Sequence, residues 1–232
     1  MIRNRSAPGK GIIKSPSLWI GFLGFTVLVT APFLFHENPV ISFKIDDLSV
    51  SSVNSYTPLI QAHCQARINQ IKEGDTVIDI QFADYAIVTR HENVDNAFKL
   101  RKYCNQKQQT MEAINRNYGT SLTLALERLW LELSLLREEG NNQPVIVTLI
   151  LHAAEPVPNQ APLDLANVKD LIQKITEDKG MVTIIGTTKQ LESDLAQLRH
   201  GIANFKLCPS VNLQSCIEDA YVTARHYGKG GN

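Results

Sequence analysis

The pattern of apolar and polar residues predicts several β-strands in this chain. Residues 40–47 read VISFKIDD, and their β-branched and aromatic side chains favour a strand. Residues 145–151 read VIVTLIL, which is apolar on both faces and typical of a central strand covered by helices on each side. Residues 76–82 and 85–89 also favour strands, and the two residues between them indicate a tight hairpin.

Helices are predicted between these strands by apolar residues spaced three and four apart. The clearest helix begins at Gly119-Thr120 and ends before Gly140, and its stripe consists of Leu122, Leu126, Leu129, Leu133 and Leu136. Pro58 opens an earlier helix, for which the expected buried stripe is Ile60, Cys64, Ile68 and Ile71. Further elements are expected as a polar helix over 95–114, a helix through Val168, Leu171, Ile172 and Ile175, a strand over 181–185, a short helix through Leu191, Leu195 and Leu198, a strand near Phe205 and a last helix from about Val211.

The order of these elements indicates the fold class. Strands alternate with helices, which implies a mostly parallel sheet with helices on both faces. We therefore predict one α/β domain over residues 37–232, with a doubly wound six-stranded sheet of the Rossmann-like kind. The second strand of the hairpin is expected at one edge of the sheet, antiparallel to its neighbour.

An uninterrupted apolar run precedes this domain. Residues 18–35 read LWIGFLGFTVLVTAPFLF and contain no charge, and a membrane helix needs roughly 17–25 such residues. We predict a transmembrane signal-anchor helix over 17–35, after a basic tail over 1–16. A cleaved signal peptide is the alternative, but Pro32 directly after the small Ala31 disfavours cleavage there.

The distribution of charge indicates an orientation and excludes one class of partner. The net charge is zero, with 23 basic and 23 acidic residues, but four basic residues precede the apolar run: Arg3, Arg5, Lys10 and Lys14. By the positive-inside rule the N-terminus is cytoplasmic, and the domain lies outside the cell membrane as a single-pass protein. The remaining 19 basic and 23 acidic residues make the domain mildly acidic, so no nucleic-acid partner is expected.

The four cysteines are consistent with an extracytoplasmic domain. Cys208 and Cys216 bracket the short loop CPSVNLQSC, and we predict a disulfide between them. Cys64 lies on an apolar helical face, where a buried free cysteine is common, and a bond to Cys104 is the alternative. No CxxC motif is present, which disfavours a structural zinc site.

Oxygen-bearing side chains follow the first predicted strand. Asp47, Ser49 and Ser51 form a D-x-S-x-S sequence, so one turning loop can direct a carboxylate and two hydroxyls to one point. Mg²⁺ and similar hard cations prefer oxygen ligands. In doubly wound sheets, ligands bind beyond the carboxyl ends of the strands. This loop is therefore the candidate metal site.

Three sequence features together resemble the von Willebrand factor A (vWA) domain family. They are Asp47-x-Ser49-x-Ser51 after an apolar strand, Gly74-Asp75-Thr76-Val77 at the second strand, and Gly119-Thr120 at the head of a leucine-rich helix. The resemblance covers the whole region after the apolar run. It implies a metal-ion-dependent adhesion site made by Asp47, Ser49, Ser51 and Thr120, which would hold Mg²⁺ or Mn²⁺ and contact a partner protein.

The chain departs from the family pattern after the fourth strand, where the family has an aspartate. This sequence reads HAAEP there, with Ala153 in the position of the acid. Glu155 is the candidate compensating acid, although a solvated loop glutamate is the ordinary interpretation. The neighbouring His152 is interpreted as a loop or core histidine.

Three classes of function remain to be compared. The leading hypothesis is a membrane-anchored, non-enzymatic module that binds an unidentified protein through the strand-end face. The alternative is a metal-free vWA-like domain that serves as a structural component of a membrane complex, as the loss of the acid at Ala153 suggests. An enzyme is disfavoured because the sequence contains no G-x-S-x-G, P-loop, H-E-x-x-H or G-x-G-x-x-G motif.

Overall fold

The computed structural model describes residues 38–48, 56–83, 85–96, 99, 121–151, 164–187 and 189–227. Its strands are β1 (Ile41–Asp47), β2 (Thr76–Phe82), β3 (Ala86–Asn93), β4 (Val145–Ile150), β5 (Gly180–Ile185) and β6 (Phe205–Cys208). Its helices are α2 (Tyr56–Gln70), α4 (Leu122–Glu138), α5 (Leu165–Glu177), α6 (Lys189–Ala196) and α7 (Leu213–Tyr227), with short 3₁₀ turns at Gln197–Arg199 and Ser210–Asn212. Residues Asn38–Asn232 form one compact unit.

The six strands form a single sheet in the order β3-β2-β1-β4-β5-β6. All neighbours are parallel except β2 and β3, which pair antiparallel. The predicted fold class is therefore confirmed, including the antiparallel edge strand. β4 lies inside the sheet and every one of its residues is buried, as its apolar sequence predicts.

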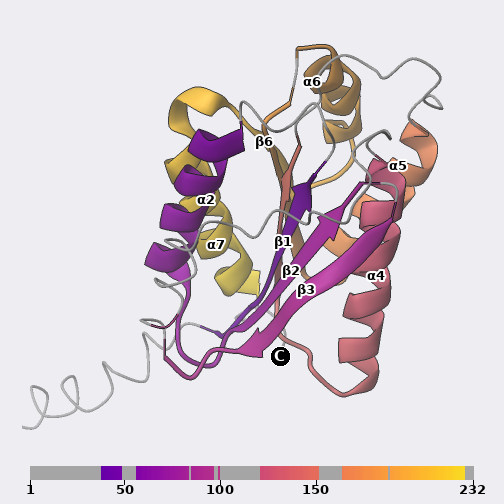
Figure 1. Ribbon diagram of the computed structural model, residues 1–232. Coiled ribbons are helices and arrows are strands. Elements are labelled where there is room, and N and C mark those ends of the chain that lie inside the picture. Colours follow the sequence, from indigo (N-terminus) through magenta and orange to yellow (C-terminus); the bar gives the residue numbers. More distant parts are fainter. Residues whose placement is uncertain are drawn as a thin grey trace, which may run out of the picture. The chain divides into compact units, whose positions relative to one another are not determined.

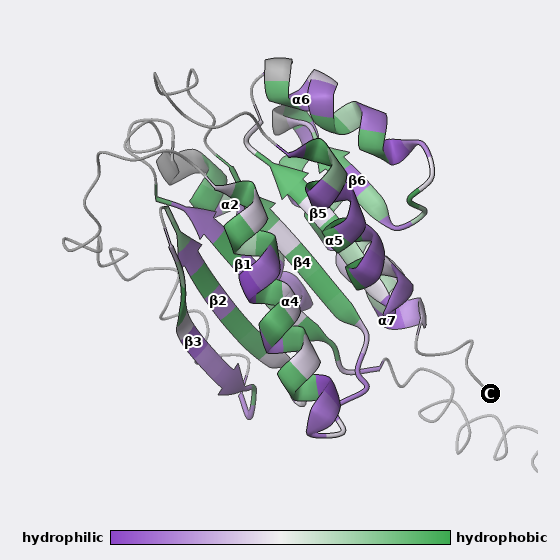
Figure 2. Cartoon of the chain, turned by 90° about the vertical axis from the view of Figure 1, so that its right-hand side faces the viewer, coloured by the Kyte–Doolittle hydropathy of each residue, from purple (hydrophilic) through white to green (hydrophobic). Residues whose placement is uncertain are grey.

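Helices cover both faces of the sheet (Figure 1). α4 and α5 pack on one face, against a core that includes Phe43, Ile45, Ile78 and Val147. α2 and α7 pack on the other face, against a smaller apolar cluster that includes Val77 and Ile146. Figure 2 shows the resulting distribution of hydropathy, with green inner strands and with purple residues along α5 and β3. Because parallel strands buried on both sides need two helical layers, this arrangement follows from the apolar strands themselves.

α4 has the buried stripe and the C-terminal end that the leucine spacing and Gly140 predict, and it begins at Leu122, two residues after the predicted Gly119-Thr120. Its fully buried residues are Leu122, Ala125, Leu126, Leu129, Leu133 and Leu136. The Ser121 hydroxyl accepts a hydrogen bond from the Leu124 amide at 3.4 Å and caps the first turn. Gly140, with φ of 86°, follows the last turn, and the Asn141 amide donates to the Leu136 carbonyl at 2.9 Å. A glycine after the helix accommodates this left-handed conformation without strain.

Two expectations about the elements are wrong. The predicted strand over 85–89 extends to Asn93, because Arg90 pairs with Asp79 of β2 and the following residues continue the ladder. The predicted buried stripe of α2 is wrong at three of its four positions, and only Ile71, directly after the helix, is buried. Its Ile60, Cys64 and Ile68 are half-buried, and its buried positions are His63, Ala66 and Arg67. Polar side chains on the sheet beneath α2 account for this difference.

Two predicted elements lie outside the described residues. They are the transmembrane segment over 17–35 and most of the polar helix over 95–114. Within the ranges that the structure does describe, no helix combines the length and apolar character needed to cross a membrane.

Candidate metal and partner site

The sheet contains one point at which the chain reverses its winding direction. From β1 the chain continues to β2 on one side, whereas β4 pairs with β1 on the other side. Ligands of open α/β sheets bind in the crevice beyond the carboxyl ends of two such strands. Here those ends are Asp47 of β1 and Ile150 of β4. The first residue of the D-x-S-x-S sequence therefore lies at the switch point.

Two adjacent carboxylates end β1, and they lie on opposite faces of the sheet. Asp46 and Asp47 are both fully buried. The Asp46 carboxylate lies 2.7 Å from the ammonium group of Lys44, on the side of α2 and α7. Strand alternation places Asp47 on the other side, with Ile45. The Asp46 carboxylate is thus paired with a cation, and Asp47 is the last residue of the strand, directly before the loop that follows.

The other predicted site residues lie outside the described residues. These are Ser49, Ser51, Thr120 and Glu155, together with Ala153 and His152. In the described part of the chain, no three histidines, cysteines, aspartates or glutamates gather in a way that could hold a metal ion. The structure places Asp47 at the carboxyl end of β1, and the metal-binding role of Asp47 and of the other three residues stays a prediction.

A glycine holds the neighbouring strand end close to β4. Gly186 follows β5 directly and has a φ of 80°, a conformation that side chains rarely adopt. A Cβ atom at this position would lie 2.2 Å from the carbonyl oxygen of Leu151, the residue after β4. The Leu151 amide in turn donates to the Ile185 carbonyl at 2.9 Å. This close approach fixes the carboxyl ends of β4 and β5 beside the switch point.

A buried polar row crosses four strands beneath α2 and α7. Its members are paired neighbours in the sheet: Asp79 of β2, Lys44 of β1, Thr148 of β4 and Thr183 of β5. Arg67 of α2 donates to the Asp79 carboxylate at 2.5 Å, and Arg90 of β3 lies 3.3 Å from the same group. The Arg67 guanidinium also donates to the Ser42 hydroxyl at 3.1 Å and to the Ser42 carbonyl at 2.8 Å. α2 is therefore attached to β1 and β2 by charge as well as by apolar contact.

The charges in this network support one another. Burial would raise the pKa of Asp79, but Arg67, Lys44 and Arg90 outweigh that effect and hold this pKa well below its ordinary range. Burial likewise opposes the charge of Arg67, but the Asp79 carboxylate outweighs it and raises the pKa of Arg67. Both groups therefore stay ionised inside the domain. α2 is the helix that follows the D-x-S-x-S sequence along the chain and begins at Tyr56, and the network fixes this helix on the sheet.

His63 and Tyr221 complete the polar layer. Burial lowers the pKa of His63 well below its ordinary value, and the cations of Arg67 and Lys44 act in the same direction. The Nε2 atom of His63 has no hydrogen-bond partner among the described residues. Burial raises the pKa of Tyr221, whose hydroxyl lies 2.5 Å from the Ser42 hydroxyl. His63 is therefore neutral and Tyr221 is protonated at physiological pH.

A second buried ion pair closes the opposite end of the sheet. The Arg225 guanidinium of α7 donates to both oxygens of Asp75, at 3.0 and 2.6 Å. The same carboxylate accepts from the backbone amides of Val40 and Lys72, both at 2.8 Å. Asp75 precedes β2 in the Gly-Asp-Thr-Val sequence. This aspartate therefore joins α7 to the amino ends of β1 and β2 and is structural.

Sequence reasoning did not identify this polar layer, although a signal was present. In β1 the polar residues Ser42, Lys44 and Asp46 alternate with apolar ones, which indicates one polar face. β2 repeats the pattern with Asp79 and Gln81. A helix that covers such a face needs complementary polar residues on its buried side.

Disulfides connect the helices to other parts of the chain. Cys208, at the end of β6, is bonded to Cys216 of α7, with 5.8 Å between the Cα atoms. Cys64 of α2 is also disulfide-bonded, and its partner lies outside the described residues. The interpretation of Cys64 as a free buried cysteine is therefore wrong. A half-buried position at the surface of α2 leaves its sulfur accessible to another segment.

Comparison with known proteins gives similarity at the level of structure. No protein-family model and no curated protein matches this sequence. A D319A mutant of the PilB minor pilin from Streptococcus sanguinis is 11% identical with a TM-score of 0.58, over 85% of this chain and 64% of that chain. A von Willebrand factor type A protein from Catenulispora acidiphila is 11% identical with a TM-score of 0.55, over 82% and 43%.

A third structure contains a metal. Proximal thread matrix protein 1 from the mussel byssus, with a zinc-occupied MIDAS motif, is 13% identical with a TM-score of 0.56 over 82% of this chain and 48% of that chain. This chain thus spans between 43% and 64% of the length of these three proteins. Identities this low carry information about the fold alone. The described domain has the vWA-like α/β fold.

Proposed function

We propose that this chain is a membrane-anchored, non-enzymatic module that binds a partner protein through the carboxyl-end face of its sheet. One observation carries the proposal: Asp47, buried at the end of β1, lies at the switch point of a vWA-like sheet and begins a D-x-S-x-S loop. The vWA-like structures among its neighbours support a role in protein interaction.

The proposal includes a divalent cation, Mg²⁺ or Mn²⁺, held by Asp47, Ser49, Ser51 and Thr120. The donor set fits a hard cation in part, because it offers one carboxylate and three hydroxyls. Asp46 cannot add a second charge from its place in β1, since Lys44 holds its carboxylate on the other face. A bound cation would supply an open coordination position that an acidic side chain of the partner completes.

Calorimetric titration with Mg²⁺ and with Mn²⁺ tests the metal site. We expect binding to the native chain, loss of binding in Asp47→Asn, and no change in the control Asp170→Asn, whose carboxylate is exposed on α5. Ala153→Asp should tighten binding, because a second carboxylate adds Coulombic attraction. If the native chain and Ala153→Asp both fail to bind either metal, the metal site is refuted.

That negative result would favour the second candidate function, a metal-free structural component of a membrane complex. The observation in its favour is the alanine at position 153. In that case Asp47 would keep a structural role at the end of β1, and Asp47→Asn would lower stability without altering any response to metal.

The anchor is proposed from the apolar run over 17–35 and the basic residues before it. Labelling with a membrane-impermeant maleimide in intact cells tests it. Val222→Cys, at a residue of α7 that is 48% exposed, should be labelled, and Ser6→Cys in the basic tail should not. The reverse pattern would refute the proposed orientation.

A further inference from the structure

α4 carries a second apolar stripe that faces solvent. Leu124, Leu131 and Leu135 are 39%, 49% and 45% exposed, although the same helix buries six other residues against the sheet. With Arg128 they are spaced four, three and four residues apart, which is the spacing of the a and d positions of a coiled coil. Such a row forms one narrow seam along the outer side of the helix.

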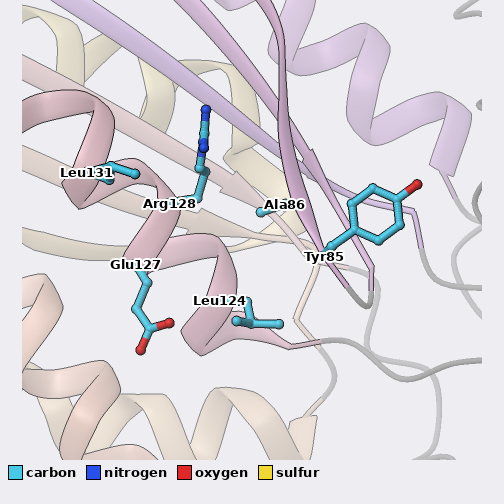
Figure 3. Close-up of a pocket in the computed structure, with 6 residues that line it drawn as sticks. All are labelled: Tyr85, Ala86, Leu124, Glu127, Arg128 and Leu131. Atoms are coloured by element: carbon cyan, nitrogen blue, oxygen red, sulfur yellow. The ribbon is translucent and has the colours of Figure 1, made fainter. Parts of the chain in front are cut away.

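The seam borders a shallow groove at the edge of the sheet (Figure 3). One wall is formed by Leu124, Glu127, Arg128 and Leu131 of α4, and the other by Tyr85 and Ala86 at the start of β3. Tyr85 is 46% exposed and adds to the apolar surface. Tyr85 and two of the α4 leucines line this groove, and Leu135 continues the exposed apolar stripe beyond it. An exposed apolar stripe beside a groove is a candidate interaction surface.

The charged residues along the seam could pair with the same residues of a second copy. Arg128 lies between Glu127 and Glu132, and its guanidinium is 2.5 Å from the Glu132 carboxylate. Its Nε atom is enclosed and has no hydrogen-bond partner in the described part of the chain. In the heptad of this seam Arg128 occupies an a position and Glu127 occupies the preceding g position. When two such helices pack in parallel, the a residue of one copy lies beside the g residue of the other. Arg128 of one copy would then face Glu127 of the other, and the reverse pair would follow by symmetry.

We propose that this surface binds a second copy of the same chain, with the two α4 helices packed in parallel. The leucines form the apolar contact, and two Arg128–Glu127 pairs flank it. The seam runs over the twelve residues from Leu124 to Leu135, and its ends are about 17 Å apart at 1.5 Å per residue. An interface this small gives a weak dimer in solution. Anchoring in one membrane raises the effective concentration and favours the association.

The parallel orientation rests on the proposed membrane anchor. The described domain begins at Asn38, next to the amino end of β1. A two-fold axis along α4 keeps the first residues of both domains at the same end, so both chains can enter one membrane. An antiparallel pair would direct them to opposite ends.

Cysteine cross-linking of the full chain in its native membrane tests the proposal. Leu124→Cys, Leu131→Cys and Leu135→Cys should each give a dimer of the chain with itself on mild oxidation. Val222→Cys is the matched control, because Val222 is as exposed as Leu131 but lies on α7. Cross-linking of all three seam variants no greater than the control, or only to other proteins, would overturn the proposal. A cross-link only between Leu124→Cys and Leu135→Cys copies would overturn the parallel orientation.

Charge exchange provides an independent measurement. Arg128→Glu gathers six carboxylates around the seam, which are residues 127, 128 and 132 of each copy, and should weaken dimerisation at least about tenfold. The double variant Glu127→Arg with Arg128→Glu restores opposite charges across the axis and should recover dimerisation. Arg128 also pairs with Glu132 of the same copy, so thermal unfolding is measured for both variants to separate a loss of stability from a loss of dimerisation. Unchanged dimerisation of Arg128→Glu would contradict the charge pairing. Failure of the double variant to dimerise better than Arg128→Glu would contradict it as well. Metal binding and maleimide labelling report on the proposed function separately, so failure of either proposal can be recognised on its own.

Discussion

The buried Arg67–Asp79 pair gives the sharpest test of how α2 is held on the sheet. The substitution Asp79→Asn keeps the shape of the side chain and removes its charge. It leaves the Arg67 guanidinium buried beside a neutral amide, with hydrogen bonds to Ser42 and a contact with Tyr221. Breaking a buried ion pair from one side costs about 3–5 kcal/mol. We therefore expect the free energy of unfolding to fall by that amount at pH 7.

The acid dependence of stability gives a second readout of the same pair. The pKa of Asp79 is depressed in the folded state, so its contribution is present above its ordinary unfolded pKa of about 4 and is lost as the pH falls. The difference in stability between the native chain and Asp79→Asn should therefore narrow by about 1 kcal/mol when the pH is lowered from 7 to 3.

Urea unfolding followed by circular dichroism over this pH range measures both effects. Asp170→Asn is the control, because it breaks an exposed pair with Lys174 and should cost about 0.5 kcal/mol or less. A loss below about 1 kcal/mol for Asp79→Asn, or a pH dependence equal to that of the control, would show that the buried charges do not hold α2 in place.

Three further predictions concern other parts of the domain. A buried neutral histidine becomes protonated when the protein unfolds in acid, so His63 should lower the free energy of unfolding below pH 6.5, by up to about 2 kcal/mol at pH 5. His63→Leu should remove this loss in urea titrations. The control His200→Leu, at an exposed position, should keep it. Gly186→Ala should lower the melting temperature far more than Gly140→Ala, because both glycines have positive φ but a Cβ atom meets backbone only at Gly186; equal effects would contradict this. Replacing both cysteines of the β6–α7 disulfide by serine should cost about 2–3 kcal/mol in urea unfolding, and an unchanged midpoint would argue against a stabilising role for it.

Sequence periodicity by itself determined most of the fold. The leucine stripe of α4 gave its buried face, and the glycine at position 140 gave the end of the helix, although the helix begins at Leu122 and not at Gly119-Thr120. The two-sided apolar sequence of 145–151 indicated its interior place in the sheet. The hairpin with a short turn indicated the antiparallel edge. Each of these features depends on residues a few positions apart, and the burial of each segment is encoded in its own apolar pattern.

The sequence alone predicted only part of the arrangement at the candidate site. The D-x-S-x-S sequence identified Asp47, and the structure places it at the end of β1 beside β4. Sequence order could not distinguish the roles of Asp46 and Asp47, since both are acidic and adjacent. Their roles differ because alternation places Asp46 on the face where Lys44 lies.

Only the tertiary structure decided which side of α2 is buried. The apolar residues Ile60, Cys64 and Ile68 suggested one face, but the helix turns His63, Ala66 and Arg67 to the sheet. Arg67 is stable there because Asp79, twelve residues later and on another element, supplies the opposite charge. A buried charge is favourable only with its partner in place, and pairing between distant segments is a property of the folded sheet. The extension of β3 through Arg90 likewise depends on Asp79 of another strand, and the disulfide of Cys64 also joins segments that are distant in the sequence.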